Sequence, residues 1–161
     1  MPSLELDHLV VGAASLEVGR AWCERTFGVT AQAGGKHPAM ATHNLLMSIA
    51  SPYFPKAYLE IIAIDPDATA SQRPRWFDLD DAAVRAHIAA APTLLHWVAR
   101  VRTGEADDID VALALLRAAG HDPGDVADSQ RATASGGVLR WRITLPRDGR
   151  RAGGGAVPLL I

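Results

Sequence analysis

The sequence has little that would suit it to an oxidising compartment or a membrane. Cys23 is the only cysteine among 161 residues, which excludes an intrachain disulfide. No stretch approaches 18 consecutive apolar residues, the length expected of a membrane-spanning helix. Residues 1–5 lack the basic start and apolar run of a signal peptide. These absences predict a cytoplasmic protein with no membrane partner.

Lysine is also scarce, and the chain has no excess of positive charge. Its 16 Lys and Arg residues are balanced by 18 Asp and Glu residues, which gives a net charge of -2 at pH 7. Nucleic-acid binding requires a basic surface, so no nucleic-acid partner is expected. Only Lys36 and Lys56 are lysines. This preference for arginine, together with abundant alanine, is typical of a GC-rich bacterial genome.

The composition that remains, 48% hydrophobic and 21% charged, is that of a globular protein. The length suits one ordinary domain or two small halves that share a core. Periodicity and turn residues predict the order strand, helix, strand, strand twice along the chain. We therefore expect an α+β fold with a first module in residues 1–67, a linker with a short helix in 68–92, and a second module in 93–161.

In the first half, the helix is expected between an N-cap at Ser15 and a C-cap at Gly28. Residues 34–38, Gly-Gly-Lys-His-Pro, are expected to form a turn or loop. The remaining predicted elements are strands at 6–11, 42–49, 57–64, 94–101, 138–145 and 156–161, and helices at 80–91 and 108–119.

Three ionisable side chains lie within otherwise apolar predicted strands. His8 and His96 each stand third in the opening strand of a half, and Glu60 lies in a Leu-Glu-Ile context. A carboxylate is rarely buried unless it is paired or binds a metal. Two imidazoles and a carboxylate could together hold Zn²⁺, Fe²⁺, Ni²⁺ or Mn²⁺. Each histidine could instead be an ordinary core residue, and Glu60 could face water at a sheet edge.

Residues 6–10 (Leu-Asp-His-Leu-Val), residues 34–44 and residues 58–62 (Tyr-Leu-Glu-Ile-Ile) together resemble the glyoxalase-like domain of the vicinal oxygen chelate superfamily. The resemblance covers residues 4–66 and extends more weakly to the strand of His96 and to residues 155–161. It implies two βαβββ modules that form a cupped mixed sheet with the helices outside. The strand missing from each half would then lie near 29–33 and within 121–134.

The resemblance also implies a divalent metal in the cup, with ligands from the first and last strands of each module. By position, His8, Glu60 and His96 would be metal ligands. The fourth ligand should lie in the strand that contains Leu159, yet residues 156–161 carry no acidic or imidazole group. We therefore expect the second module to be incomplete at its C-terminus. The resemblance leaves open whether cups form within one chain or across a homodimer.

Other polar and aromatic residues are candidates for the cup. Glu60 and His37 are expected to be catalytic, His37 because the two glycines before it would let its loop fold over the cup mouth. Asn44, Tyr58 and Trp97 are expected to bind substrate. His37 could equally be an exposed loop histidine. The side chains of Arg140 and Arg142 could face the cup and favour an anion, or form a solvated outer face.

Three functions remain open at this stage. The first is a metal-dependent enzyme that acts on a small oxygenated metabolite by isomerase- or lyase-type chemistry through an enediolate-like intermediate. The second is a metal-free protein that binds or sequesters a small molecule or antibiotic, as bleomycin-resistance proteins of this superfamily do. The third is a degenerate member whose role is protein interaction. Fold alone does not choose among them.

Overall fold

The computed structural model describes residues 3–71, 73–102, 108–132 and 137–161, with residues 108, 131 and 132 described by backbone alone. Two α-helices and four strands lie before residue 92, and the order strand, helix, strand, strand, strand occurs on each side of that point. The elements are β1 (Ser3–Gly12), α1 (Leu16–Phe27), β2 (Gln32–His37), η1 (Pro38–Met40), β3 (Thr42–Ser48), β4 (Tyr58–Ile64), η2 (Trp76–Asp78), α2 (Ala82–Ala90), β5 (Thr93–Arg102), α3 (Asp108–Ala118), β6 (Asp125–Ala132), β7 (Val138–Leu145), η3 (Ala152–Gly155) and β8 (Leu159–Leu160).

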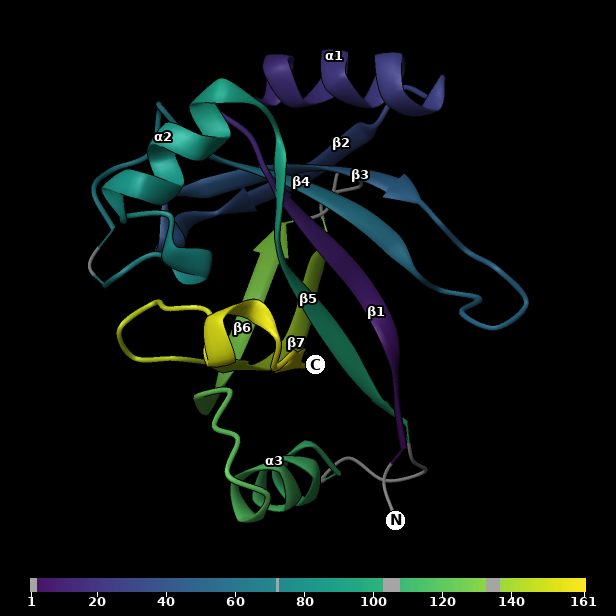
Figure 1. Ribbon diagram of the computed structural model, residues 1–161, viewed down its shortest axis with the longest axis vertical. Coiled ribbons are helices and arrows are strands. Elements are labelled where there is room, and N and C mark those ends of the chain that lie inside the picture. The colour runs from purple at the N-terminus through teal and green to yellow at the C-terminus, as the bar shows by residue number, and fades with distance from the viewer. Residues whose placement is uncertain (1–2, 72, 103–107, 133–136) are drawn as a thin grey trace.

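Six strands form a mixed sheet in the order β2-β3-β4-β1-β5-β8. At its centre β1 runs parallel to β4 and antiparallel to β5, and β5 runs parallel to β8. Figure 1 shows β1 and β5 side by side through the middle of the molecule, with α1 and α3 at opposite ends. This arrangement confirms the predicted α+β fold with a mixed sheet. The division into modules at residues 67 and 92 stays a prediction.

The second half departs from the first in one respect. Strands β6 and β7 pair with each other as a separate two-stranded sheet, and within the described residues neither is paired with β8. The hairpin instead lies against β2, and its link to β8 is a hydrogen bond from Leu160 N to Thr144 Oγ1 at 2.9 Å. The strands of the first half therefore form one continuous sheet, whereas in the second half the β6–β7 hairpin is separate from β5 and β8.

Local signals placed most elements correctly. The Ser15 hydroxyl accepts a hydrogen bond from Val18 N, and Gly28 ends α1 in the left-handed conformation with φ 68°. The strands expected near 29–33 and within 121–134 are present as β2 and β6. The last strand is shorter than predicted because η3 occupies part of the expected loop and Pro158 precedes β8.

The prediction of a turn at residues 34–38 is wrong, because residues 32–37 form β2. The two glycines occupy an irregularity in the pairing of β2 with β3, between Ala33 and Lys36. A Cβ at Gly34 would stand 2.1 Å from Oδ1 of Asn44, so glycine is required by close approach to this side chain.

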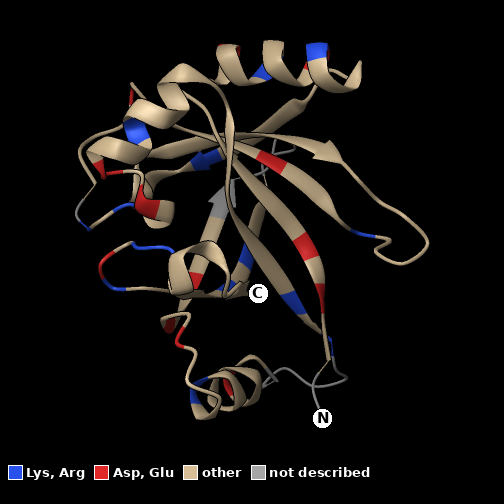
Figure 2. Ribbon diagram, viewed as in Figure 1, with Lys and Arg blue, Asp and Glu red and all other residues tan. Residues whose placement is uncertain are grey.

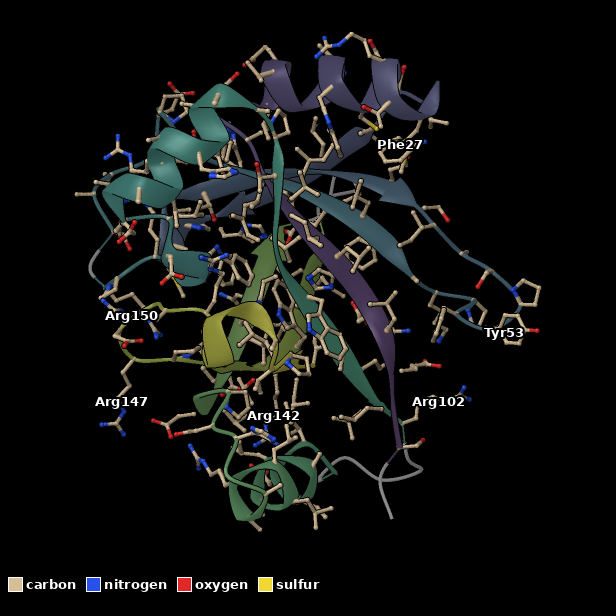
Figure 3. All side chains as sticks on the ribbon, viewed as in Figure 1. Phe27, Tyr53, Arg102, Arg142, Arg147 and Arg150 are labelled. Carbon is tan, nitrogen blue, oxygen red and sulfur yellow. The ribbon has the colours of Figure 1, made fainter. Side chains whose placement is uncertain are left out.

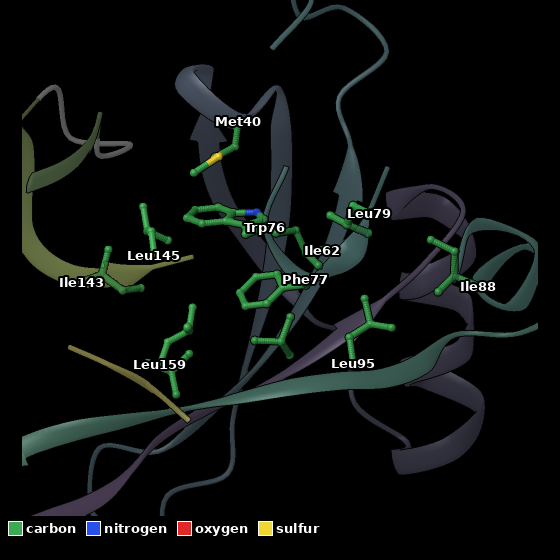
Figure 4. Close-up of a cluster of buried hydrophobic side chains, with 12 residues drawn as sticks. Met40, Ile62, Trp76, Phe77, Leu79, Ile88, Leu95, Ile143, Leu145 and Leu159 are labelled. Atoms are coloured by element: carbon green, nitrogen blue, oxygen red, sulfur yellow. The ribbon is translucent and has the colours of Figure 1, made fainter. Parts of the chain in front are cut away.

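The predicted connector between the halves is part of the core. Trp76 and Phe77 lie at the centre of the largest buried apolar cluster, between Met40 on one side and Ile143 and Leu159 on the other (Figure 4). Phe77 and the residue after it, Asp78, both have positive φ, at 61° and 58°. Such a conformation is costly for residues with a Cβ and persists where surrounding contacts enforce it.

Two contacts from the C-terminal loop hold this segment in place. Asp78 N donates to Gly149 O at 3.0 Å, and Arg151 Nε donates to Asp78 Oδ2 at 2.7 Å.

Charged residues are few on the large sheet and are mostly carried by helices and loops (Figure 2). The exceptions are acidic residues on β1 and β4 and basic residues on β2 and β5. Among the described helices, none combines the length and apolarity needed to cross a bilayer.

The packing of α1 on β4 depends on Gly19. A Cβ there would lie 2.4 Å from Cγ2 of Ile61 and 3.2 Å from Cβ of Ala13. Overpacking by an added methyl group costs roughly 1–3 kcal/mol, which should exceed the gain of about 1 kcal/mol from the higher helix propensity of alanine. We expect Gly19→Ala to lower the free energy of unfolding by about 1–2 kcal/mol in urea titration. Arg20→Ala, at the exposed neighbouring position, is the control, and an equal effect of both variants would contradict this account.

Candidate functional site

The candidate site begins at an irregularity in β1. Leu6 is paired with Ala99 and His8 with Val98, so Asp7 is an extra residue between two successive pairs. Such a bulge re-aims a side chain that strict alternation would direct to the opposite face. As a result Asp7 and His8, although adjacent in sequence, both line a cavity of about 260 Å³. Asp7 is only 2% exposed.

Asp7 fixes the orientation of His8. Its Oδ1 atom lies 2.7 Å from His8 Nδ1, and its other oxygen is paired with the guanidinium of Arg100. A carboxylate at this distance holds the proton on Nδ1 and leaves the Nε2 lone pair available in the neutral imidazole. His8 Nε2 points toward Glu60, with 3.6 Å between Nε2 and Oε2. The His8 ring is also stacked on Tyr58 at 4.6 Å between centroids.

Asn44 fixes Glu60 in a similar way. The Asn44 amide nitrogen donates to Glu60 Oε1, and its carbonyl Oδ1 accepts from Gly35 N at 2.8 Å. Gly34 and Gly35 thus bring the backbone of β2 close enough to hold the amide. Both polar ends of Asn44 are engaged by the protein, and this favours a role in positioning Glu60 over direct contact with substrate.

His96 lies on the same face of the sheet but in a separate environment. It is opposite Val10, whose other neighbour across the sheet is Glu60. Neither ring nitrogen has a hydrogen-bond partner in the described part of the chain, and the ring packs against Phe77 at 5.6 Å between centroids. Burial, with a smaller contribution from Arg151, lowers the pKa of His96 to about 4. The imidazole is therefore neutral at pH 7, the form that binds a metal.

The register of the two central strand pairs shows what occupies the fourth position expected of the site. His8 and His96 are equivalent in the two halves, so Val10 corresponds to Val98. Glu60 is the β4 partner of Val10, and Leu159 is the β8 partner of Val98. The residue equivalent to Glu60 is thus a leucine that is 1% exposed within the main apolar cluster.

The remaining cavity wall is mostly apolar and comes from β2, β3, residues 76–77, β7 and the last residue, Ile161. His37 also lines it, with Nδ1 3.2 Å from Thr42 Oγ1 and its ring edge-on to Trp76. The other lining residues not yet named at the cavity are Leu46, Phe77, Leu139, Trp141, Ile143 and Ile161. The side chains that β7 contributes to the cavity alternate along the strand, as expected of one face of a strand; they are Leu139, Trp141 and Ile143.

Of the predicted substrate contacts, Trp97 does not line this cavity, and its role in substrate binding stays a prediction. It is paired with Leu9 and so faces the side of the sheet opposite to His8 and His96. There it packs on the cluster beneath α3, and its Nε1 donates to Ala156 O at 3.3 Å. Tyr58, Asn44, Glu60 and His37 do line the cavity.

The arginines of β7 belong to the outer face. Arg142 is paired with Asp110 of α3 at 2.9 Å, beside that helix in Figure 3, and Arg140 is exposed. Sequence reasoning missed Asp7, Arg100, Trp76 and Phe77 as site residues. The bulge that exposes Asp7 to the cavity has no sequence signal of its own. Trp76 could have been predicted at the site, because it is an aromatic residue in an otherwise polar connector.

A divalent cation suits part of this donor set. Within the residues that the structure describes, no three His, Cys, Asp or Glu side chains are already grouped to hold a metal. Nevertheless, 3.6 Å between His8 Nε2 and Glu60 Oε2 is longer than a hydrogen bond and close to the spacing of two ligands on one cation. The Asp7 carboxylate behind His8 is the usual support of a metal-binding imidazole. The buried, unpartnered imidazole of His96 is the third donor on this face.

The role of Asp7 predicts a change of tautomer in a variant. Asp7→Asn should reduce the Nδ1-protonated form of His8, which ¹⁵N imidazole chemical shifts at pH 8 report directly. Glu5→Gln is the matched control, because Glu5 also neighbours Arg100 but, among the described residues, forms no ion pair with His8. An unchanged His8 tautomer in Asp7→Asn would contradict the positioning role.

The lowered pKa of His96 predicts a pH dependence of stability in metal-free protein. Between about pH 6.5 and 4 the unfolded chain takes up a proton on His96 that the folded chain does not. Stability therefore falls as the pH is lowered through this window. In urea titrations with EDTA, wild type should lose more stability from pH 7 to 4.5 than His96→Gln, whereas His87→Gln, at an exposed position, should follow wild type. Parallel curves for wild type and His96→Gln would overturn the assignment.

With this geometry in place, comparison with known proteins identifies the family. A family model described as "Glyoxalase-like domain" matches residues 6–161. No curated protein matches the chain. Among solved structures, a hypothetical protein from Staphylococcus aureus is similar with a TM-score of 0.60 and 15% identity, over 98% of this chain and 58% of that one.

Two methylmalonyl-CoA epimerase structures are also similar. The enzyme from Mycobacterium tuberculosis has a TM-score of 0.52 and 17% identity, over 96% of this chain and 83% of that one. An epimerase in complex with methylmalonyl-CoA and NH4+ has a TM-score of 0.55 and 18% identity, over 98% of this chain and 94% of that one. At these identities the likeness establishes the fold alone. Since the family model covers nearly the whole sequence, the chain belongs to the glyoxalase-like domain family, with the vicinal oxygen chelate fold.

Proposed function

We propose that the protein is a metal-dependent enzyme that transfers a proton at a carbon of a small oxygenated substrate. The observation that carries this proposal is the pair formed by His8 Nε2 and Glu60 Oε2, 3.6 Å apart in an apolar-walled cavity. Each side chain is held by a hydrogen bond to a neighbouring residue, His8 by Asp7 and Glu60 by Asn44. These hydrogen bonds keep both groups in one geometry without substrate, as preorganised sites require.

His8 and Glu60, with His96 as the third ligand, would hold a divalent cation such as Zn²⁺, Fe²⁺, Ni²⁺ or Mn²⁺. When bound, the cation supplies Lewis acidity toward two neighbouring substrate oxygens and so acidifies the adjacent C–H bond. His96 is neutral and without a protein partner among the described residues, so it has a free donor atom. Because Phe77 packs against it, use of His96 requires that aromatic ring to move.

Glu60 is the group best placed to move the proton. Asn44 engages Oε1, and Oε2 faces the interior beside His8. A carboxylate held this way accepts a proton from a substrate carbon and can return it to the same or a neighbouring atom, which is isomerase-type chemistry. His37 is a second proton-transfer group at the cavity wall, with Thr42 beside its Nδ1. Trp76, Phe77 and Trp141 exclude water from the reacting centre.

The name of two structural neighbours, methylmalonyl-CoA epimerase, supports the same class of reaction, since epimerisation is an isomerisation. The proposal takes no substrate from them. A homodimer and a cytoplasmic location stay predictions from the sequence.

Metal uptake tests the site. Equilibrium dialysis of the purified chain against Zn²⁺, Fe²⁺, Ni²⁺ or Mn²⁺, read by elemental analysis, should give about one bound cation per cavity for at least one metal. His8→Ala should weaken that binding by at least about 100-fold, since it removes a first ligand. His87→Ala, on the exposed side of α2, should bind as wild type does. Failure of every metal to bind would refute the proposal.

Proton transfer tests the chemistry separately. The metal-loaded protein in D2O should incorporate deuterium next to the carbonyl of at least one compound in a panel of 2-oxo acids, 2-hydroxy aldehydes and acyl thioesters, measured by NMR. Glu60→Gln should reduce the exchange rate by about 100-fold or more, because general-base catalysis contributes that much. Equal rates in wild type and Glu60→Gln would remove Glu60 from the reaction.

A metal-free binding protein is the second candidate, and the leucine at position 159 favours it. The half-site around His96 has an apolar residue where the half-site around His8 has Glu60. The cavity would then bind a planar hydrophobic molecule between Tyr58, Trp76 and Trp141. In that case ligand quenching of tryptophan fluorescence would be the same with and without EDTA, and dialysis would give no bound metal.

A further inference from the structure

A second cavity of about 690 Å³ adjoins the candidate site. It lies between β2 and η1 on one side and the β6–β7 hairpin on the other. Its wall shares His37, Trp76 and Trp141 with the first cavity. Its other lining residues include Lys36, Ala39, Met40, Arg73, Asp128 and Leu145.

This second cavity exists because the hairpin is detached from the large sheet. In the described residues β6 and β7 pair only with each other, and β6 lies beside β2 without strand pairing between them. A space is therefore left between β2 and β6, bounded by these strands and by the side chains around them. Its floor is apolar, with Met40 and Leu145 both buried, while the cations Lys36 and Arg73 and the anion Asp128 stand among its polar residues.

We propose that this second cavity is the tail compartment of an extended substrate, whose oxygenated head lies between His8 and Glu60 and whose aliphatic tail lies between β2 and the hairpin. This inference rests on the proposed function of the head site. It adds the substrate class, a small oxygenated group on an apolar chain.

Three observations favour a substrate tail as the occupant. The two cavities share the side chains of His37, Trp76 and Trp141, so they lie next to each other. The tail compartment is larger than the 260 Å³ head compartment, so the head occupies the lesser part of the available space. The floor has the aliphatic and aromatic composition of small-molecule pockets, with few polar groups.

Ala39 offers a way to fill the tail compartment from its rim. It lines this cavity, it is exposed, and it is not among the residues that line the head cavity. Ala39→Trp should therefore occupy the compartment without disturbing His8 or Glu60. Ala86→Trp, at an exposed position of α2, is the matched control with the same substitution far from either cavity.

The test is isothermal titration of the metal-loaded protein with straight-chain 2-oxo acids of four, six, eight and ten carbons. Because burial of one methylene is worth about 0.8 kcal/mol, affinity should rise roughly three- to fourfold per added carbon in wild type and in Ala86→Trp. In Ala39→Trp the four-carbon acid should bind as in wild type, and the gain with chain length should disappear.

The outcomes separate the two proposals. Binding that does not vary with chain length, or a chain-length gain that survives in Ala39→Trp, overturns the tail compartment and leaves the head site standing. Absence of binding by every acid also overturns the tail compartment, whereas the head site is judged by metal uptake. A dimer that light scattering detects in wild type and that Ala39→Trp dissociates would show that a second copy covers the cavity, and this result also overturns the tail compartment.

Discussion

The site depends on one extra residue in the central strand. The bulge at Asp7 brings two consecutive side chains to the same cavity, and the carboxylate of Asp7 then holds the imidazole of His8. Arg100 on the neighbouring strand compensates the buried charge of Asp7, which would otherwise be costly. On the other side of β1, Asn44 and the glycines of β2 hold Glu60. The pair of His8 and Glu60 is thus positioned by three features: the register shift in β1, the ion pair of Arg100 with Asp7, and the close approach of the β2 backbone to Asn44.

The segment between the halves closes the site. Phe77 and Asp78 adopt a costly backbone conformation, and the C-terminal loop holds Asp78 through Gly149 and Arg151. The result is an aromatic pair at the wall of the first cavity, in which Trp76 also lines the second cavity and Phe77 packs against His96. Strained backbone at such a position is consistent with a functional role.

Much of the fold could be predicted from the sequence, because the signals were local. Ser15, Gly28 and the alternation along β7 depend on near neighbours, and they gave the correct elements. Strand alternation predicted His8, Glu60 and Asn44 at the cavity. His37 also lines the cavity, although the sequence predicted it in a loop. Alternation also places Trp97, which is adjacent to His96, on the opposite side of the sheet. Asp7 escaped prediction because a bulge depends on the partner strand, and Gly34 because its close approach to Asn44 is a tertiary contact.

The central claim is that His8 and Glu60 share a divalent cation, and X-ray absorption at the metal edge of the Zn²⁺-loaded protein tests it most directly. We predict imidazole nitrogen and carboxylate oxygen ligands at about 2.0–2.2 Å. The imidazole signal should decrease in His8→Ala and again when His96→Gln is added. A spectrum with oxygen ligands alone, unchanged by His8→Ala, would contradict the claim.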